Sequence, residues 1–178
     1  MQLNLKQIHG TRAHEHISRH YEASALQAPD DAYTIKAPVD LTFDLEKDRD
    51  NYHLVGQATT TLELFCGRCL ESFSLPVRAP FDLRYLPHRE DAGGDEREIE
   101  DDDLSTTYYD DETIDLGQLI REQLYLALPM KPLCDEDCQG LCPACGTNLN
   151  RERCGCDPKW EDPRLAALRT VIKKDSDA

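Results

Sequence analysis

The chain has 178 residues, which is enough for one domain with a hydrophobic core and a small appendage, and too few for two large domains. A hydrophobic fraction of 39% and a charged fraction of 31% fit a folded protein with polar loops or tails and exclude a wholly disordered chain. The 35 acidic and 20 basic residues give a net charge of −15, which disfavours non-specific binding to phosphate backbones and favours basic partners.

The N-terminus, MQLNLKQIHG, has neither the basic start nor the apolar stretch of a secretory signal. No window approaches the roughly 20 apolar residues that span a bilayer. We therefore expect a cytoplasmic protein. In a reducing compartment its eight cysteines are expected to be thiols or metal ligands, with structural disulfides as the minority interpretation.

Residues 1–36 carry an ambiguous pattern. Leu3 and Leu5 alternate with polar neighbours, as in a short strand, and a histidine-rich polar segment follows. His16 and His20 are one helical turn apart, which would suit two metal ligands, but no acidic or cysteine ligand accompanies them in a recognisable motif. The pattern favours a solvated surface segment, with a helix as one conformation open to it.

From residue 39 onward, apolar and polar residues alternate with the period of a half-buried strand. The alternation covers residues 39–46, and after the turn-like EKDRDN it resumes over residues 52–64. Shorter strand-like pieces follow at residues 73–77 and 81–85. Strands joined by short connections predict an antiparallel β-meander that curls into a sandwich or partial barrel.

The stretch HREDAGGDEREIEDDD, residues 88–103, is too charged to offset its ordering entropy, and we predict a mobile acidic loop. STTYYDDETI then predicts one more strand with a turn. Asp115 occupies an N-cap position before apolar residues at helical spacing, which predicts an amphipathic helix over residues 115–128. Asp162 and Pro163 predict the start of a short C-terminal helix.

The cysteines fall into four close pairs: Cys66 with Cys69, Cys134 with Cys138, Cys142 with Cys145, and Cys154 with Cys156. Two sulfurs from one tight turn supply one edge of a tetrahedral site, so two pairs complete one zinc site. Glycines accompany the pairs where such turns need unusual dihedrals, at Gly67, Gly140, Gly146 and Gly155. All eight cysteines are therefore predicted metal ligands, holding two structural zinc ions.

Two groupings of these pairs are open. Eight residues separate Cys145 from Cys154, and closing that loop costs about 2 kcal/mol, against roughly 10 to 16 kcal/mol for binding of a structural zinc. This favours one local site made of the last four cysteines. The first four then form a second site, across a 64-residue interval whose closure costs about 4 kcal/mol. The competing grouping places Cys134, Cys138, Cys142 and Cys145 around one metal.

An iron–sulfur cluster would also accept four thiolates. A thioredoxin-like role for the first pair would need a helix directly after it, which the pattern does not predict. A zinc ion with four thiolates has no open coordination position and does not catalyse. No Ser/His/Asp arrangement, phosphate-cradling loop or credible carboxylate pair indicates an enzyme, so we expect none.

The predicted fold class is α+β: an antiparallel β-meander or partial barrel, an amphipathic helix and a C-terminal cysteine-rich, zinc-ribbon-like segment. The predicted domains are a mainly β domain over residues 1–133 and a cysteine-rich zinc segment over residues 134–178. The helix before Pro129 leads the chain directly into the second of them.

CGRCLESFSLPV, followed by IDLGQLIREQLYLALPMKPLCDEDCQGLCPACGTNLNRERCGC, closely resembles the YceD family, whose members are linked to accumulation of large-subunit ribosomal RNA. The resemblance covers roughly residues 40–160, and what carries over is the set of matching cysteines, with no catalytic residues. It implies a cytoplasmic factor, bacterial or plastid, that acts in biogenesis of the large ribosomal subunit.

The resemblance and the charge point in different directions, because an RNA-linked protein is expected to show a basic face. The C-terminal region is locally less acidic, with Arg151, Arg153, Lys159, Arg164, Arg169, Lys173 and Lys174. These residues fit a solvated helix face better than an RNA contact. We therefore expect the partner to be a basic ribosomal protein or a large-subunit precursor, with direct rRNA binding disfavoured.

Two rival functions remain open. A zinc-ribbon nucleic-acid or transcription adaptor would need a basic surface beside the ribbon. A thiol-redox or metal-delivery protein would need an exposed cysteine of low pKa.

Overall fold

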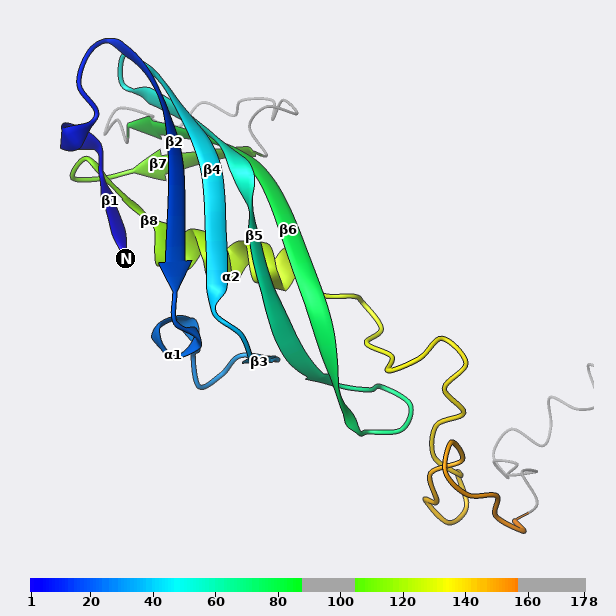
Figure 1. The fold of residues 1–178 in the computed structure, drawn as a ribbon. Helices are drawn as coiled ribbons and strands as arrows, with labels where there is room; N and C mark the ends of the chain where they lie inside the picture. Colours follow the sequence, from blue (N-terminus) through cyan, green and yellow to red (C-terminus); the bar gives the residue numbers. More distant parts are fainter. Residues whose placement is uncertain (88–104, 157–178) are drawn as a thin grey trace, which may run out of the picture. The chain divides into compact units, whose positions relative to one another are not determined.

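The computed structural model describes residues 1–87 and 105–156 (Figure 1). Contacts divide them into two units. The first contains Met1–Leu64 and Phe73–Met130, and the second contains Phe65–Ser72 together with the described residues from Lys131 onward. The second unit thus combines two segments that are far apart in sequence. The predicted acidic loop and the predicted C-terminal helix lie outside the described residues.

The main sheet has six strands in the order β2-β4-β5-β6-β7, with β3 paired to β5. Its strands are β2 (Arg12–Tyr21), β3 (Thr34–Ile35), β4 (Val39–Asp48), β5 (Asn51–Phe65), β6 (Ser72–Pro87) and β7 (Thr106–Tyr109). The pairs β2 with β4 and β4 with β5 are antiparallel. The turn between β4 and β5 lies inside EKDRDN, which confirms the turn predicted there.

The remaining elements complete the first unit. The strands β1 (Gln2–Asn4) and β8 (Thr113–Asp115) form a separate antiparallel pair. A 3-10 helix (Leu5–Gln7) follows β1, and the short helix α1 (Ala23–Leu26) follows β2. Among the described residues, no helix is long and apolar enough to cross a bilayer.

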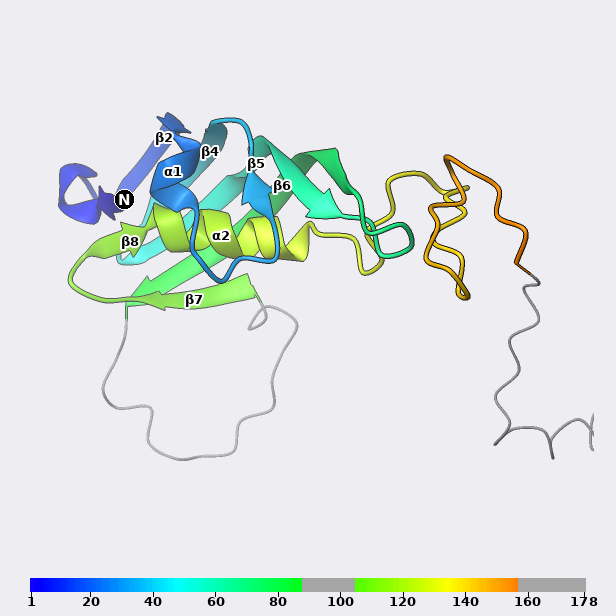
Figure 2. The same ribbon diagram turned by 90° about the horizontal axis from the view of Figure 1, so that it is seen from below.

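The predicted amphipathic helix is present as α2 (Leu116–Leu126). The Asp115 side chain accepts hydrogen bonds from the backbone amides of Gly117 at 2.8 Å and Gln118 at 3.2 Å, which confirms the predicted N-cap. The helix lies across one face of the main sheet (Figures 1 and 2).

The hydrophobic core lies between this face and α2. The strands contribute the alternating apolar residues that predicted them, and the helix contributes its apolar stripe. Fully buried members include Val39, Leu41, Phe43, Leu45, Leu54, Leu119, Ile120 and Leu124. Each such side chain contributes roughly 1.5 to 3 kcal/mol by leaving water, so the two periodicities determine the architecture of this unit.

The histidine-rich part of the N-terminal segment does not form the helix that its pattern left open, because Arg12–Tyr21 form a ten-residue strand, β2. Only one neighbouring strand, β4, pairs with it among the described residues. Ile17 is its one buried side chain in that range. An edge strand with polar side chains on both faces lacks the apolar alternation by which strands are recognised.

Two further expectations about the sheet were wrong. The pieces at residues 73–77 and 81–85 belong to one 16-residue strand, β6, which tolerates Pro76 and Pro80 because β7 pairs only with residues 84–87. In addition, β7 pairs with β6 in parallel, so the sheet is not a purely antiparallel meander. The described strands form an open sheet and not a closed barrel.

Candidate metal centres

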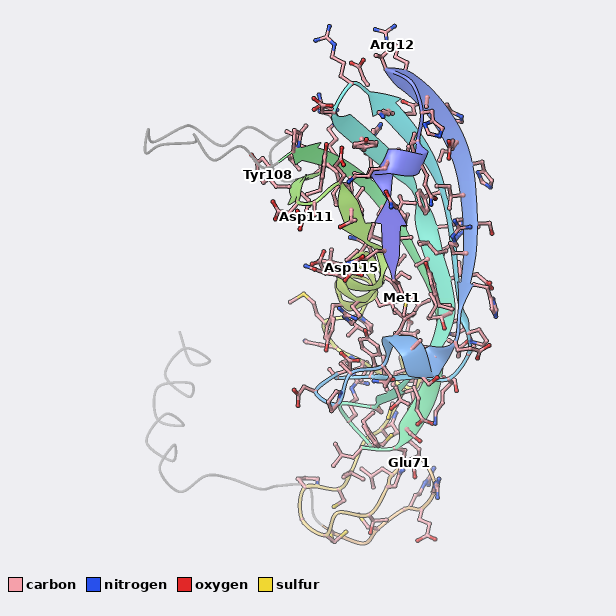
Figure 3. All side chains as sticks on the ribbon, turned by 90° about the vertical axis from the view of Figure 1, so that its left-hand side faces the viewer. Met1, Arg12, Glu71, Tyr108, Asp111 and Asp115 are labelled. Atoms are coloured by element: carbon pink, nitrogen blue, oxygen red, sulfur yellow. The ribbon has the colours of Figure 1, made fainter. Side chains whose placement is uncertain are left out.

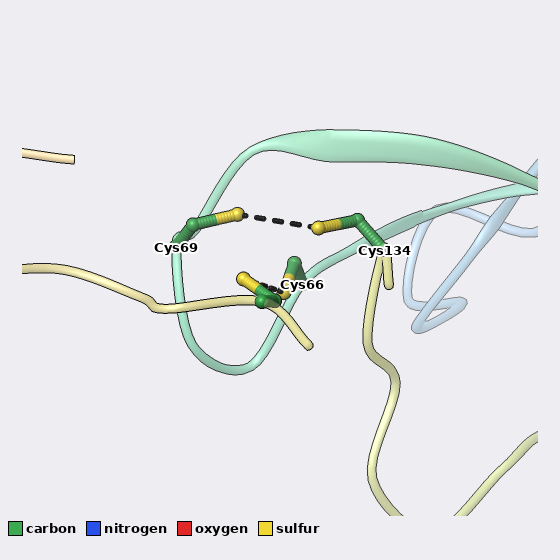
Figure 4. Close-up of side chains that lie close together, drawn as sticks. Cys66, Cys69 and Cys134 are labelled. Carbon is green, nitrogen blue, oxygen red and sulfur yellow. Dashed lines mark hydrogen bonds between the residues drawn. The ribbon is translucent and has the colours of Figure 1, made fainter. Parts of the chain in front are cut away.

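The first tetrad consists of Cys66, Cys69, Cys134 and Cys138, whose Sγ atoms all lie within 4.8 Å of one another. The Cys69 and Cys134 sulfurs are 3.7 Å apart (Figure 4). Those of Cys66 and Cys138 are 3.8 Å apart. Zn–S bonds of about 2.3 Å in a regular tetrahedron place the sulfurs about 3.8 Å apart. The spacing therefore matches a four-thiolate metal site, and the four cysteines are free thiols.

The second tetrad consists of Cys142, Cys145, Cys154 and Cys156, which meet the same 4.8 Å limit. The structure thus brings the cysteines together in the grouping that loop closure favoured, and not in the competing one. The two tetrads differ in construction. The first joins two distant segments and buries three of its four cysteines, whereas the second is local and buries only Cys142.

Each tetrad contains one knuckle of the form Cys-x-x-Cys, and the two knuckles have the same backbone geometry. The amide of Leu70 donates to the Cys66 carbonyl at 3.0 Å, and the amide of Gly146 donates to the Cys142 carbonyl at 2.8 Å. Both donor residues have positive φ, +60° for Leu70 and +76° for Gly146. The same turn therefore occurs in both tetrads and brings the two sulfurs of each Cys-x-x-Cys pair to the same side of the backbone.

The glycines beside the cysteine pairs predicted the positions of unusual backbone dihedrals only in part. Gly140 and Gly146 have positive φ, whereas Gly67 and Gly155 do not. Leu70, which adopts the left-handed conformation in the first knuckle, gives no such signal, because leucine rarely takes a conformation that glycine adopts freely.

Arg68 and Asn150 hold the first tetrad in place, and sequence reasoning did not identify them. The Arg68 backbone amide donates to Cys66 Sγ at 3.4 Å, and its guanidinium donates to the carbonyls of Glu136 at 3.0 Å and Cys138 at 2.9 Å. The Asn150 side chain donates to Cys138 Sγ at 3.3 Å. Such donors orient sulfur ligands and stabilise thiolates. An arginine between the two cysteines of a knuckle was the available signal.

Hydrogen bonds lower the pKa of some thiols in each tetrad and raise the pKa of others. The Cys69 backbone amide contributes most to lowering the pKa of Cys66 to about 6, although burial opposes it. Thr147, whose hydroxyl oxygen is 3.2 Å from Cys145 Sγ, contributes most to lowering the pKa of Cys145 to about 6. The hydrogen bond with Cys145 raises the pKa of Cys156 to about 12. A bound cation must therefore displace protons, and metal affinity should fall in acid.

The family of the chain follows from comparison with known proteins. The family profile described as large ribosomal RNA subunit accumulation protein YceD matches residues 54–171. The chain belongs to the YceD family. The YceD match includes both tetrads and leaves out β2.

Curated relatives agree with this assignment. A chloroplastic "large ribosomal RNA subunit accumulation protein YCED homolog 1" of Arabidopsis thaliana is 30% identical over 162 residues, which cover 76% of this chain and 49% of the relative. An uncharacterised protein of Mycobacterium tuberculosis is 35% identical over 143 residues, which cover 79% of this chain and 65% of the relative. The chain spans about half the length of its plant YceD relatives, 49% and 55%. No solved structure matches the chain.

The histidines of β2, outside the YceD match, do not form the metal pair that their spacing suggested. The Nδ1 atoms of His16 and His20 lie 2.9 Å from Asp44 Oδ1 and 2.7 Å from Asp40 Oδ1, on the neighbouring strand β4. Four residues along a strand separate two histidines by about 13 Å, too far for one ion. The β2–β4 register instead places each histidine directly opposite a carboxylate.

We expect Asp40→Asn to lower the pKa of His20 toward its ordinary 6.5, because the hydrogen bond to Asp40 is the main cause that raises it. A raised folded-state pKa means that this pair stabilises the fold fully below about pH 6.5 and loses that effect as pH rises through the folded-state pKa. An NMR titration of the His20 ring measures the shift. Asp44→Asn, which removes the partner of His16, serves as the control, and equal His20 pKa values in both variants and wild type would contradict the assignment.

Proposed function

We propose that the chain is a non-enzymatic factor in biogenesis of the large ribosomal subunit and supports accumulation of its rRNA. The observation that carries the proposal is membership of the YceD family over residues 54–171. The plant relatives bear this role in their names, and the matched region includes all eight cysteines. The metal centres then serve the fold of a binding protein.

Zinc is the proposed occupant of both tetrads. Four sulfur ligands at tetrahedral spacing select zinc or an iron–sulfur cluster among common protein metals. Zinc needs no inorganic sulfide and fits two cysteine knuckles of the kind seen here. Four protein ligands fill its coordination sphere, which supports a structural and non-catalytic role.

The proposed partner is a basic ribosomal protein or a large-subunit precursor that contains one. A net charge of −15 attracts basic surfaces and repels the phosphates that dominate binding to nucleic acid. Attraction of this kind acts over a Debye length of about 8 Å at physiological ionic strength, so the affinity should fall with added salt.

Pull-down from cell extract, with and without ribonuclease, tests the partner. We expect large-subunit proteins to remain bound after RNA digestion, and we expect cells that lack the chain to have less large-subunit rRNA relative to small-subunit rRNA. If association vanishes on RNA digestion and the purified protein binds protein-free rRNA tightly, the protein-partner proposal is wrong.

One observation favours metal delivery as a second candidate function. Cys134 in the first tetrad and Cys145 in the second are exposed, which offers an incoming ligand a route to each metal. A competing chelator would then remove zinc from the folded protein within seconds to minutes. Retention of both metals over hours in the native state would exclude this candidate and leave the structural role.

A further inference from the structure

A small pocket in the first unit is lined by tyrosines and carboxylates. Its volume is about 220 Å³, below the roughly 300 Å³ at which small-molecule sites begin, and it suits a single side chain. The lining comes from β6, β7, the turn after β7, the last residue of β8 and the middle of α2, and it includes Tyr85, Tyr108, Tyr109, Asp110, Asp115 and Glu122. No lysine, arginine or histidine among the described residues lines it.

Tyr85 is the tyrosine of this pocket whose ring packs in the core. Its side chain belongs to a residue that is only 7% exposed, and its hydroxyl makes no hydrogen bond within the described part of the chain. Burial of the ring, together with the negative charges of Glu122 and Asp115, raises the pKa of Tyr85 to about 12. A hydroxyl on a nearly buried ring that lines a pocket and has no protein partner in the described ranges is available to a donor that comes from outside.

The carboxylates of the pocket are engaged to different degrees. Asp115 caps α2 through two backbone amides. Glu122 accepts one hydrogen bond, at 2.8 Å from the Gln118 side chain, and pairs with no cation among the described residues. Carboxylates beside electron-rich ring faces are the chemistry that recognises an ammonium or guanidinium group.

The acidic character continues beyond the pocket. An adjoining hollow of about 500 Å³ shares Tyr109 and Asp110 with it and adds three further carboxylates, those of Asp50, Asp111 and Glu112. Lys6 is the one cation among the described residues that line this hollow, and it is paired with Glu112 at 3.0 Å. Tyr108, Asp111 and Asp115 lie on the side of the sheet that carries α2 (Figure 3). A ligand with several consecutive positive charges could therefore contact carboxylates both in the pocket and in the adjoining hollow.

We propose that the Tyr85 pocket binds one lysine or arginine side chain of a basic polypeptide, whose neighbouring cations lie over Asp110 and Asp111. The Tyr85 hydroxyl accepts a hydrogen bond from the incoming cation, and Glu122 balances its charge. This inference rests on the proposed function, in which the partner is a basic protein, and it locates the surface that meets that partner.

The test uses the full chain and a decalysine peptide at low salt, with affinity measured by calorimetry. Glu122→Gln is expected to weaken binding about fivefold. Tyr85→Phe, which keeps the ring and removes only the hydroxyl, is expected to weaken it about threefold. Glu46→Gln makes the same change of charge on β4, outside the pocket, and is the matched control. The melting temperature of each variant verifies that it is folded.

The same three variants are then compared in pull-down of large-subunit particles. Weaker binding for both pocket variants than for the Glu46→Gln control supports the pocket in either assay. If all three variants bind decalysine and particles equally, charge acts non-specifically and the pocket proposal is overturned, while the proposed function stands. If wild-type protein retains no large-subunit particles, the proposed function fails, and the decalysine comparison alone still decides the pocket.

Discussion

Cys66→Ser is expected to remove one metal ion per chain and to unfold the first knuckle and residues 134–141, whereas Cys142→Ser is expected to remove one metal ion and loosen only residues 142–156. The two positions are a matched pair, because each is the buried first cysteine of its knuckle. The first tetrad connects residues 65–72 to the chain after Lys131. The second tetrad closes only a short local loop.

The expected difference follows from what each metal holds together. Binding of a structural zinc contributes roughly 10 to 16 kcal/mol, and loss of the first one removes the link between two distant segments. The Arg68 hydrogen bonds to Glu136 and Cys138 cannot replace it, since a hydrogen bond contributes only about 1 kcal/mol net.

Elemental analysis together with amide hydrogen exchange measures both effects. In Cys66→Ser, the amides of the first knuckle and of residues 134–141 should lose protection. In Cys142→Ser, these amides should stay protected. Loss of both metals from either variant, or the same exchange pattern in both, would contradict two independent centres.

Gly56→Ala is expected to destabilise the first unit by about 3 kcal/mol, at the upper end of the range for overpacked sites. Gly56 on β5 lies opposite Phe43 on β4. A Cβ atom at this position would overlap the Thr42 carbonyl oxygen and the Cβ of Phe43. Strand β4 cannot move away easily, because it is paired on both sides and Phe43 is 1% exposed in the core.

Chemical denaturation of the variant and wild type measures this cost. Val55→Ala is the control, since the neighbouring side chain is 42% exposed and its truncation is expected to cost less than about 1 kcal/mol. A Gly56→Ala protein as stable as wild type would show that β4 and β5 pair less closely at this point.

The parts of the fold that were predictable have local causes. The strands β4 and β5 carry strict alternation because one face is buried against α2, and Asp115 signals the helix start because its side chain caps the first amides. The grouping of the cysteines into tetrads could also be predicted, since the short loop after Cys145 favours a site that joins Cys142 and Cys145 with Cys154 and Cys156.

The parts of the fold that could not be predicted depend on tertiary contacts, which the local sequence pattern does not reveal. On the core face of strand β2, the polar residues Glu15 and Arg19 interrupt the apolar residues, so the apolar alternation is broken and the strand is recognised only by its pairing with β4 in the folded sheet. The parallel pairing of β7 follows a connection long enough for a crossover, and sequence alone does not choose between the two directions. The roles of Leu70 and Arg68 appear only once the knuckle geometry is known.

Metal content per chain, measured on the full protein purified under reducing conditions, tests most directly the claim that the eight cysteines form two four-thiolate zinc centres. We predict two zinc ions per chain and no freely titratable thiol in the loaded protein. Iron in place of zinc, or no metal with all eight thiols titratable, would contradict it.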